Sequence, residues 1–209
     1  MPTSRRPDAL VRGPRRPGDD TRARAAAAGI AVFWLGTLVA GALAPGYSIR
    51  DDYVSSLAGR GSEVAVLGIA TLAVLGLSHL TSAAALRGAV GMPLALAGVS
   101  GLVVAAFRTA CPGGAAGCGF GSNDAVPDLA DLTHVYAVVA YEIAVLAAMV
   151  VVAGRVARTR PVGAALTIAA AAVSVALALQ IGGADSGWWQ RGWLVVNTGW
   201  LVLVTTARR

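Results

Sequence analysis

The sequence predicts an all-α, polytopic membrane protein: a bundle of six transmembrane helices. First, 56% of its 209 residues are hydrophobic, 13% are charged and the mean hydropathy is +0.67, a composition too apolar for a soluble domain of this length. Second, the chain contains six apolar runs, each near the ~20 residues that a helix needs to cross a bilayer. These runs are 25–44, 64–86, 88–107, 132–153, 162–181 and 192–206.

The chain divides into a tail and a membrane domain. Residues 1–24 carry seven arginines and show no apolar periodicity, which predicts a disordered, Arg-rich cytoplasmic tail. Residues 25–209 form the predicted six-helix transmembrane domain. The first apolar run ends in a sequence of small residues that resembles a signal-peptide cleavage site, but its nearly full spanning length favours an uncleaved helix.

The distribution of arginine predicts the orientation. All 17 basic residues are arginines, and thirteen of them fall on one side of the predicted helices, in the tail, in two connections and at the carboxyl end. By the positive-inside rule, both termini are cytoplasmic and the protein is a multi-pass protein of the cell membrane. Clustering at helix ends also argues for membrane orientation and against nucleic acid as a partner. The outside then holds the segments 45–63, 108–131 and 182–191.

This orientation is testable by cysteine labelling. A Ser122→Cys variant in a Cys111→Ala/Cys118→Ala background is expected to react with a membrane-impermeant maleimide added to intact cells, because Ser122 lies in a predicted outer loop. Labelling that requires permeabilised cells would reverse the orientation.

The segment from Pro45 to Leu57 is a dense polar and aromatic stretch between two apolar runs. Ser48 with Asp51 three residues later predicts a capped short helix over 48–57 that lies along the membrane surface. The end of the third predicted helix and the start of the fourth lie at the same depth as this segment, so the three together predict an outer polar rim. In this rim, Arg108 is expected to pair with an aspartate, and His134 is expected to lie near Tyr53, Ser55 or Ser56. The candidate binding residues of this rim are Tyr47, Ser48, Asp51, Asp52, Tyr53, Arg108, Asp131 and His134.

Two cysteines, Cys111 and Cys118, lie in the predicted outer loop, separated by a Gly/Pro-rich spacer. Thiols on the oxidising side of a membrane favour a disulfide, whose role would be to fix the loop. The alternative, a redox-active pair, lacks the two-residue spacing of thioredoxin-like motifs.

Three polar residues are expected inside the bundle: His79, Glu142 and Asn197. Glu142 lies about 16 Å below Asp131 along its helix, near the middle of the membrane, so it should face other helices and have a partner there. His79 is expected either to bond a neighbouring backbone or side chain within its helix, or to approach Glu142. Asn197 is expected to join helices. His79 and His134 differ by roughly 20 Å in depth, which prevents a shared metal site.

The outer segment and two helix ends also carry a family resemblance. The chain resembles the bacterial and archaeal membrane proteins of domain of unknown function 998, from about residue 25 to the carboxyl end. The resemblance implies six helices and leaves the activity open. The residues that carry it are Pro45, Tyr47, Ser48, Tyr53, Ser55 and Leu57, the run from Gly98 to Arg108 before a Cys/Pro/Gly loop, and the sequence Asp131 to His134.

Three functions remain open from the sequence. The preferred one is a non-enzymatic protein whose outer rim binds a lipid, a small molecule or an unidentified partner protein, with no cofactor and no resident metal. The second is an intramembrane hydrolase or lipid-modifying enzyme that uses Ser55 or Ser56 with His134 and Asp131, or a metal held by histidine and aspartates. The third is a transporter with Glu142 in its pathway.

Overall fold

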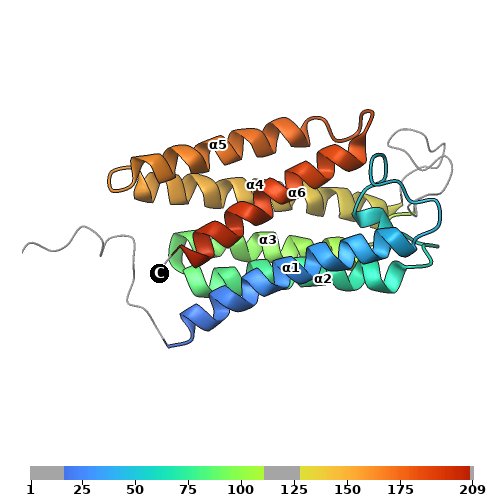
Figure 1. Cartoon of the computed structure of the whole chain (residues 1–209), viewed down its shortest axis with the longest axis horizontal. Coiled ribbons are helices and arrows are strands. Elements are labelled where there is room, and N and C mark those ends of the chain that lie inside the picture. Colours follow the sequence, from blue (N-terminus) through green and yellow to red (C-terminus); the bar gives the residue numbers. More distant parts are fainter. Residues whose placement is uncertain (1–16, 111–127, 208–209) are drawn as a thin grey trace, which may run out of the picture.

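A computed structural model describes residues 17–110 and 128–207, and it shows the predicted all-α bundle (Figure 1). Helices α1 to α5 are long and apolar enough to cross a membrane. Cys111 and Cys118 lie outside the described residues, so their disulfide stays a prediction. The helices are α1 (Asp19–Leu43), the short 3-10 helix η2 (Ser55–Ala58), α2 (Ala65–Leu86), α3 (Gly88–Ala106), α4 (Leu129–Val156), α5 (Pro161–Ala178) and α6 (Ser186–Thr206).

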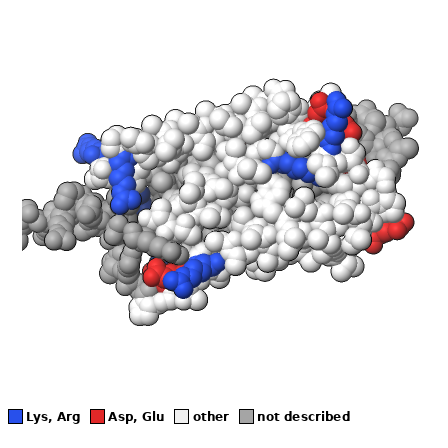
Figure 2. Space-filling view, viewed as in Figure 1, with Lys and Arg blue, Asp and Glu red and all other residues white. Residues whose placement is uncertain are grey.

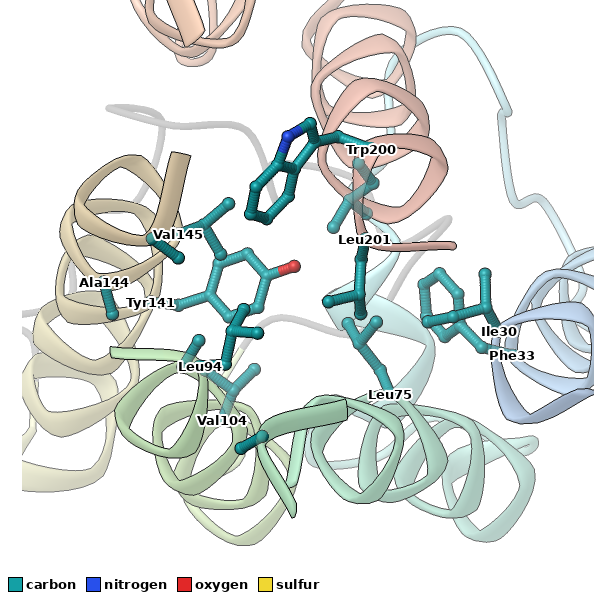
Figure 3. Packing of buried hydrophobic residues seen from close by; sticks show 14 of the residues in the cluster. Ile30, Phe33, Leu75, Leu94, Val104, Tyr141, Ala144, Val145, Trp200 and Leu201 are labelled. Atoms are coloured by element: carbon teal, nitrogen blue, oxygen red, sulfur yellow. The ribbon is translucent and has the colours of Figure 1, made fainter. Parts of the chain in front are cut away.

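The six long helices form a closed ring. Each packs against the next along the chain, and α6 closes the ring by packing against α1. Figure 3 shows labelled side chains of α1, α2, α3, α4 and α6 that pack toward one another. Leu94, Phe33 and Leu201 of this group are fully buried, as is Met149 of the same core. Because each helix packs beside the next, the connections α1–α2, α3–α4 and α5–α6 lie at one end of the molecule, and the connections α2–α3 and α4–α5 lie at the other.

Glycines bring α2 and α3 into backbone contact. A Cβ atom added to Gly76 would lie 2.8 Å from the carbonyl oxygen of Gly98, and one added to Gly101 would lie 3.0 Å from the Cα of Gly76. Ala97, on α3, is completely buried. Close approach of small residues is a common way to pack membrane helices, where lipid supplies no hydrophobic force between them.

Charged side chains gather toward the two ends of the elongated molecule, with a broad uncharged band between them (Figure 2). One end of the bundle, where α1 begins, is called the inner end because the arginine distribution predicts that it faces the cytoplasm. Helix formation there starts at Asp19, six residues before the predicted start. Asp19 pairs with Arg22 at 3.2 Å and with Arg87 at 3.0 Å, and an acidic first turn also suits the helix dipole. Residues 19–24 therefore belong to a helix and not to a disordered tail.

The outer segment does not form the predicted surface helix. The Ser48 hydroxyl oxygen accepts from the backbone N–H of Asp51 (3.2 Å), which makes a turn, and the only helical part of the segment is η2, four residues long. Leu57 is 1% exposed whereas Ile49 is 48% exposed, so the two do not share one apolar face. The segment folds over the end of the bundle because its apolar residues, such as Val54 and Leu57, are buried in the protein there.

Candidate functional site

Arg191 and Gln190, near the start of α6, anchor the first half of the outer segment. Arg191 donates to the carbonyl oxygen of Asp52 (2.9 Å) and to the hydroxyl of Tyr47, and its guanidinium lies over the Tyr47 ring. The amide oxygen of Gln190 accepts from the backbone N–H of Val54 (2.6 Å). Neither α6 residue was among the sequence candidates. The hydrogen bonds of Arg191 and Gln190 hold residues 47–54 against the start of α6.

Arg108 does not form the expected ion pair with an aspartate. Its guanidinium donates to the carbonyl oxygens of Ala58 and Gly59, both at 2.7 Å. These carbonyls lie at the end of η2, and that of Gly59 also accepts from the backbone N–H of Ser62 at 3.2 Å. The physical reason for the difference is that the folded segment delivers carbonyl oxygens to Arg108, and a cation at this helix end is favourable.

Arg60 makes the ion pairs that were expected of Arg108. It bonds Asp128 and Asp131, which together form the capping box at the start of α4. The hydrogen bond from Arg60 is the largest of the effects that lower the pKa of Asp128 to about 2. The aspartates of this turn are thus engaged in starting α4 and in holding Arg60.

The serine, histidine and aspartate proposed for hydrolysis are not joined by hydrogen bonds. His134 is buried, and its Nδ1 bonds the carbonyl oxygen of Phe107 at 2.8 Å. The Ser56 hydroxyl donates to the carbonyl oxygen of Tyr53 at 2.7 Å. Within residues 17–110 and 128–207, no three His, Cys, Asp or Glu side chains lie close enough to hold a metal ion. In the part of the chain that the structure describes, these side chains therefore form neither a hydrogen-bonded nucleophile–base pair nor a metal centre.

A polar cluster at the centre of the bundle joins three helices through Glu142 of α4. One carboxylate oxygen accepts from the Ser174 hydroxyl of α5 at 2.8 Å. The other accepts from the indole N–H of Trp193 (2.8 Å) and the amide of Asn197 (2.9 Å), both on α6. Trp193 is 4% exposed, and its ring points inward toward Glu142. A carboxyl at this depth is costly without partners, and here α5 and α6 supply them.

His79 does not meet Glu142. Its Nδ1 lies 2.9 Å from the carbonyl oxygen of Leu75 and so carries the ring proton, which leaves Nε2 to accept from the hydroxyl of Tyr141 at 3.2 Å. Tyr141 also stacks edge-to-face with Trp193, at 5.6 Å between ring centroids. His79 is therefore held in the core by one bond within its own helix and one to α4. Above these rings, Ser55 lines a cavity of about 40 Å³ beneath the outer rim.

A much larger cavity, of about 700 Å³, lies between α4, α5 and α6 toward the inner end of the bundle. Arg155, Thr159 and Arg160 line it at the α4–α5 connection. Trp200 lines it too and is only 6% exposed, and its indole N–H has no hydrogen-bond partner among the described residues. Figure 3 shows the Trp200 nitrogen on the side of the ring away from Tyr141. Most of the wall is apolar, including Val152, Val173, Val195, Val196, Leu203 and Val204.

A known protein family matches the part of the chain that contains both the polar cluster and the cavity. The family described as "Protein of unknown function (DUF998)" matches residues 27–207. The chain belongs to the DUF998 family. No curated protein and no solved structure matches it. All of α2 to α6 and residues 27–43 of α1 of this DUF998 protein lie within the matched range, so the polar cluster and the cavity belong to the family domain.

The sequence of this DUF998 protein signalled some site residues and not others. Glu142 and Asn197 stand out as polar residues within apolar runs. Ser174 does not, because a serine in an alanine-rich helix is ordinary, and Trp193 reads as an interfacial tryptophan. Trp200 was missed for the same reason that the cavity was: both depend on the spacing of α4, α5 and α6.

Proposed function

We propose that this protein binds the acyl chain of a membrane lipid in the cavity between α4, α5 and α6. The observation that carries the proposal is the cavity itself. Its volume of about 700 Å³ falls within the ~300–1,000 Å³ of typical ligand pockets, and its wall is almost entirely apolar. An apolar cavity of this size inside a membrane protein suits a hydrocarbon chain.

The length of the cavity matches one leaflet of a bilayer. On α6, the lining residues run from Val195 to Ala207, which at 1.5 Å per residue is about 18 Å. Half of the ~30 Å hydrocarbon core of a bilayer is ~15 Å. A chain that enters at the inner end therefore reaches the far end of the cavity near the bilayer midplane, next to Ser174 and Asn197 of the polar cluster.

Away from the arginine end, the polar side chains that line the cavity are Thr167, whose hydroxyl donates to the carbonyl oxygen of Gly163, and Trp200. The Trp200 N–H is buried and has no acceptor among the described residues, which costs about 1–3 kcal/mol. The outer rim is less suited to a ligand, because Arg191, Arg108 and Arg60 are already bonded to protein groups.

Filling the cavity is expected to expel the lipid. A Cβ atom added to Gly199 or to Gly154 meets nothing within 4 Å, but only Gly199 lines the cavity. Gly199→Leu should therefore retain about tenfold less lipid than the wild type, while the matched control Gly154→Leu retains it fully. Native mass spectrometry of the protein purified in mild detergent counts the bound lipids, and circular dichroism checks that both variants fold.

Quenching of tryptophan fluorescence locates the chain independently. Phosphatidylcholine with brominated chains should quench Trp200, as the difference between the wild type and a Trp200→Phe variant shows. Equal lipid retention by both glycine variants, without Trp200 quenching, would mean that only surrounding bilayer lipid contacts this surface and would overturn the proposal.

A further inference from the structure

The inner end of the cavity carries two arginines on the short connection between α4 and α5. Arg155 lies in the last turn of α4, and Arg160 is the residue just before α5. Both line the cavity and both are exposed. The ion pairs within the described ranges include neither of them, so their charge is available to an anion at the mouth of the cavity.

The start of α5 adds backbone donors to the same place. Its N-cap, Arg160, makes no side-chain capping bond, and Gly163 in the first turn lines the cavity. Pro161, the first residue of α5, has no N–H, so the donors of the first turn without a partner within the helix are the N–H groups of Val162 and Gly163, and the helix dipole favours an anion beside them. The hydroxyls of Thr159 and Thr167, which also line the cavity, donate to the nearby carbonyl oxygens of Val156 and Gly163, and the described residues that line the cavity include no acidic side chain.

We propose that the cavity selects an anionic glycerophospholipid, whose phosphate binds Arg155, Arg160 and the first turn of α5 while one chain fills the apolar wall. This inference rests on the proposed binding of a lipid chain. A guanidinium presents paired N–H donors that match the geometry of phosphate oxygens. In the orientation predicted by the arginine distribution, the mouth faces the cytoplasmic leaflet, where arginines at the surface attract anionic lipids.

The continuity of the charged and apolar parts of the cavity favours a lipid over a soluble phosphate. The arginines and the apolar wall are continuous, because Arg155 and Val152 lie three residues apart on α4 and both line the cavity. A phosphate that carries an acyl chain uses both parts at once, whereas inorganic phosphate leaves the apolar wall without a ligand. The occupant that satisfies the whole cavity is therefore amphipathic and negatively charged.

The test compares lipids that share their acyl chains and differ in the headgroup. Phosphatidylglycerol, phosphatidylcholine and diacylglycerol are each titrated onto delipidated protein in neutral detergent, and binding is measured by native mass spectrometry. The wild type is expected to bind phosphatidylglycerol about tenfold more tightly than either other lipid. The double variant Arg155→Gln/Arg160→Gln should bind phosphatidylglycerol roughly tenfold to thirtyfold more weakly than the wild type, with the other two lipids unchanged.

Arg158 supplies the matched control. It lies on the same connection, is exposed and does not line the cavity, so Arg158→Gln removes a positive charge without touching the mouth. Its preference for phosphatidylglycerol should equal that of the wild type. An equal loss in Arg158→Gln would reduce the effect to net charge and overturn the inference.

The remaining outcomes separate this inference from the proposed function. If the wild type binds all three lipids equally and Gly199→Leu weakens all three, chain binding stands and headgroup selection is wrong. If no lipid binds in a Gly199-dependent way, both fail. Full displacement of phosphatidylglycerol by inorganic phosphate would assign the arginines to a soluble anion and overturn the lipid headgroup.

Discussion

Replacing Glu142 by alanine is expected to lower the free energy of unfolding by about 3 kcal/mol. The substitution leaves the N–H of Trp193 and the amide of Asn197 without their acceptor, and it leaves the Ser174 hydroxyl with the side-chain oxygen of Asn197 alone. Each buried donor without a partner costs about 1–3 kcal/mol, and all three of these residues are buried. Unfolding of the purified protein by sodium dodecyl sulfate in mixed micelles measures the change.

Glu142→Gln is the matched control, with an expected loss below about 1 kcal/mol. The Ser174 hydroxyl faces two acceptors, an oxygen of Glu142 and the side-chain oxygen of Asn197, but it has only one proton to donate. A glutamine can place its oxygen toward Trp193 and its amide N–H toward Ser174, which then donates to Asn197. Equal losses in the alanine and glutamine variants would show that the hydrogen bonds of this cluster do not stabilise the fold.

Replacing Gly68 by alanine is expected to cost about 3 kcal/mol, although alanine is the better helix former. The added Cβ atom would lie 2.5 Å from the carbonyl carbon of Leu57 and 2.6 Å from the backbone nitrogen of Ala58. These atoms are backbone, so no side-chain rotation relieves the overlap, and η2 must move off α2. The same unfolding assay measures the cost, and amide hydrogen exchange should show that residues 55–58 lose protection first.

Gly154→Ala separates this clash from any general effect of a glycine substitution. Gly154 is also helical, and a Cβ atom there meets nothing within 4 Å. Its substitution should be neutral or stabilise the protein by up to about 1 kcal/mol, through helix propensity. If both alanine variants unfold alike, the close packing of η2 on α2 is not a constraint on stability.

The sequence predicted the helices well because bilayer thickness dictates the length of an apolar run. The starts of helices were less predictable, since they depend on local polar groups: α4 begins at Leu129 and not at residue 132 because Asp128 and Asp131 cap it together. The outer segment was predicted as a helix from its capping pattern. Its fold instead follows from long-range bonds, such as that between Gln190 and Val54, which no local pattern reveals.

The candidate site was predictable only where a residue type was out of place. A lone glutamate in an apolar run predicts a hydrogen-bond partner inside the bundle, and Glu142 has three such partners. The partners themselves were not predictable, because rotation and spacing of α5 and α6 decide which side chains meet it. The cavity depends on the spacing of the helices. The only buried residues of α5 are Thr167 and Ser174, so α5 stands off from its neighbours and leaves room.

The polar content of α6 has a consequence for how the chain enters the membrane. Helices α1 to α5 are apolar enough to partition into lipid by themselves, and α6, which carries Gln190, Arg191 and Asn197, is not among them. Each of these three side chains bonds a segment made earlier in synthesis, either the outer segment or α4. We therefore expect the translocon to release α6 into lipid only when those partners are already in place, so that its insertion depends on assembly of the first five helices.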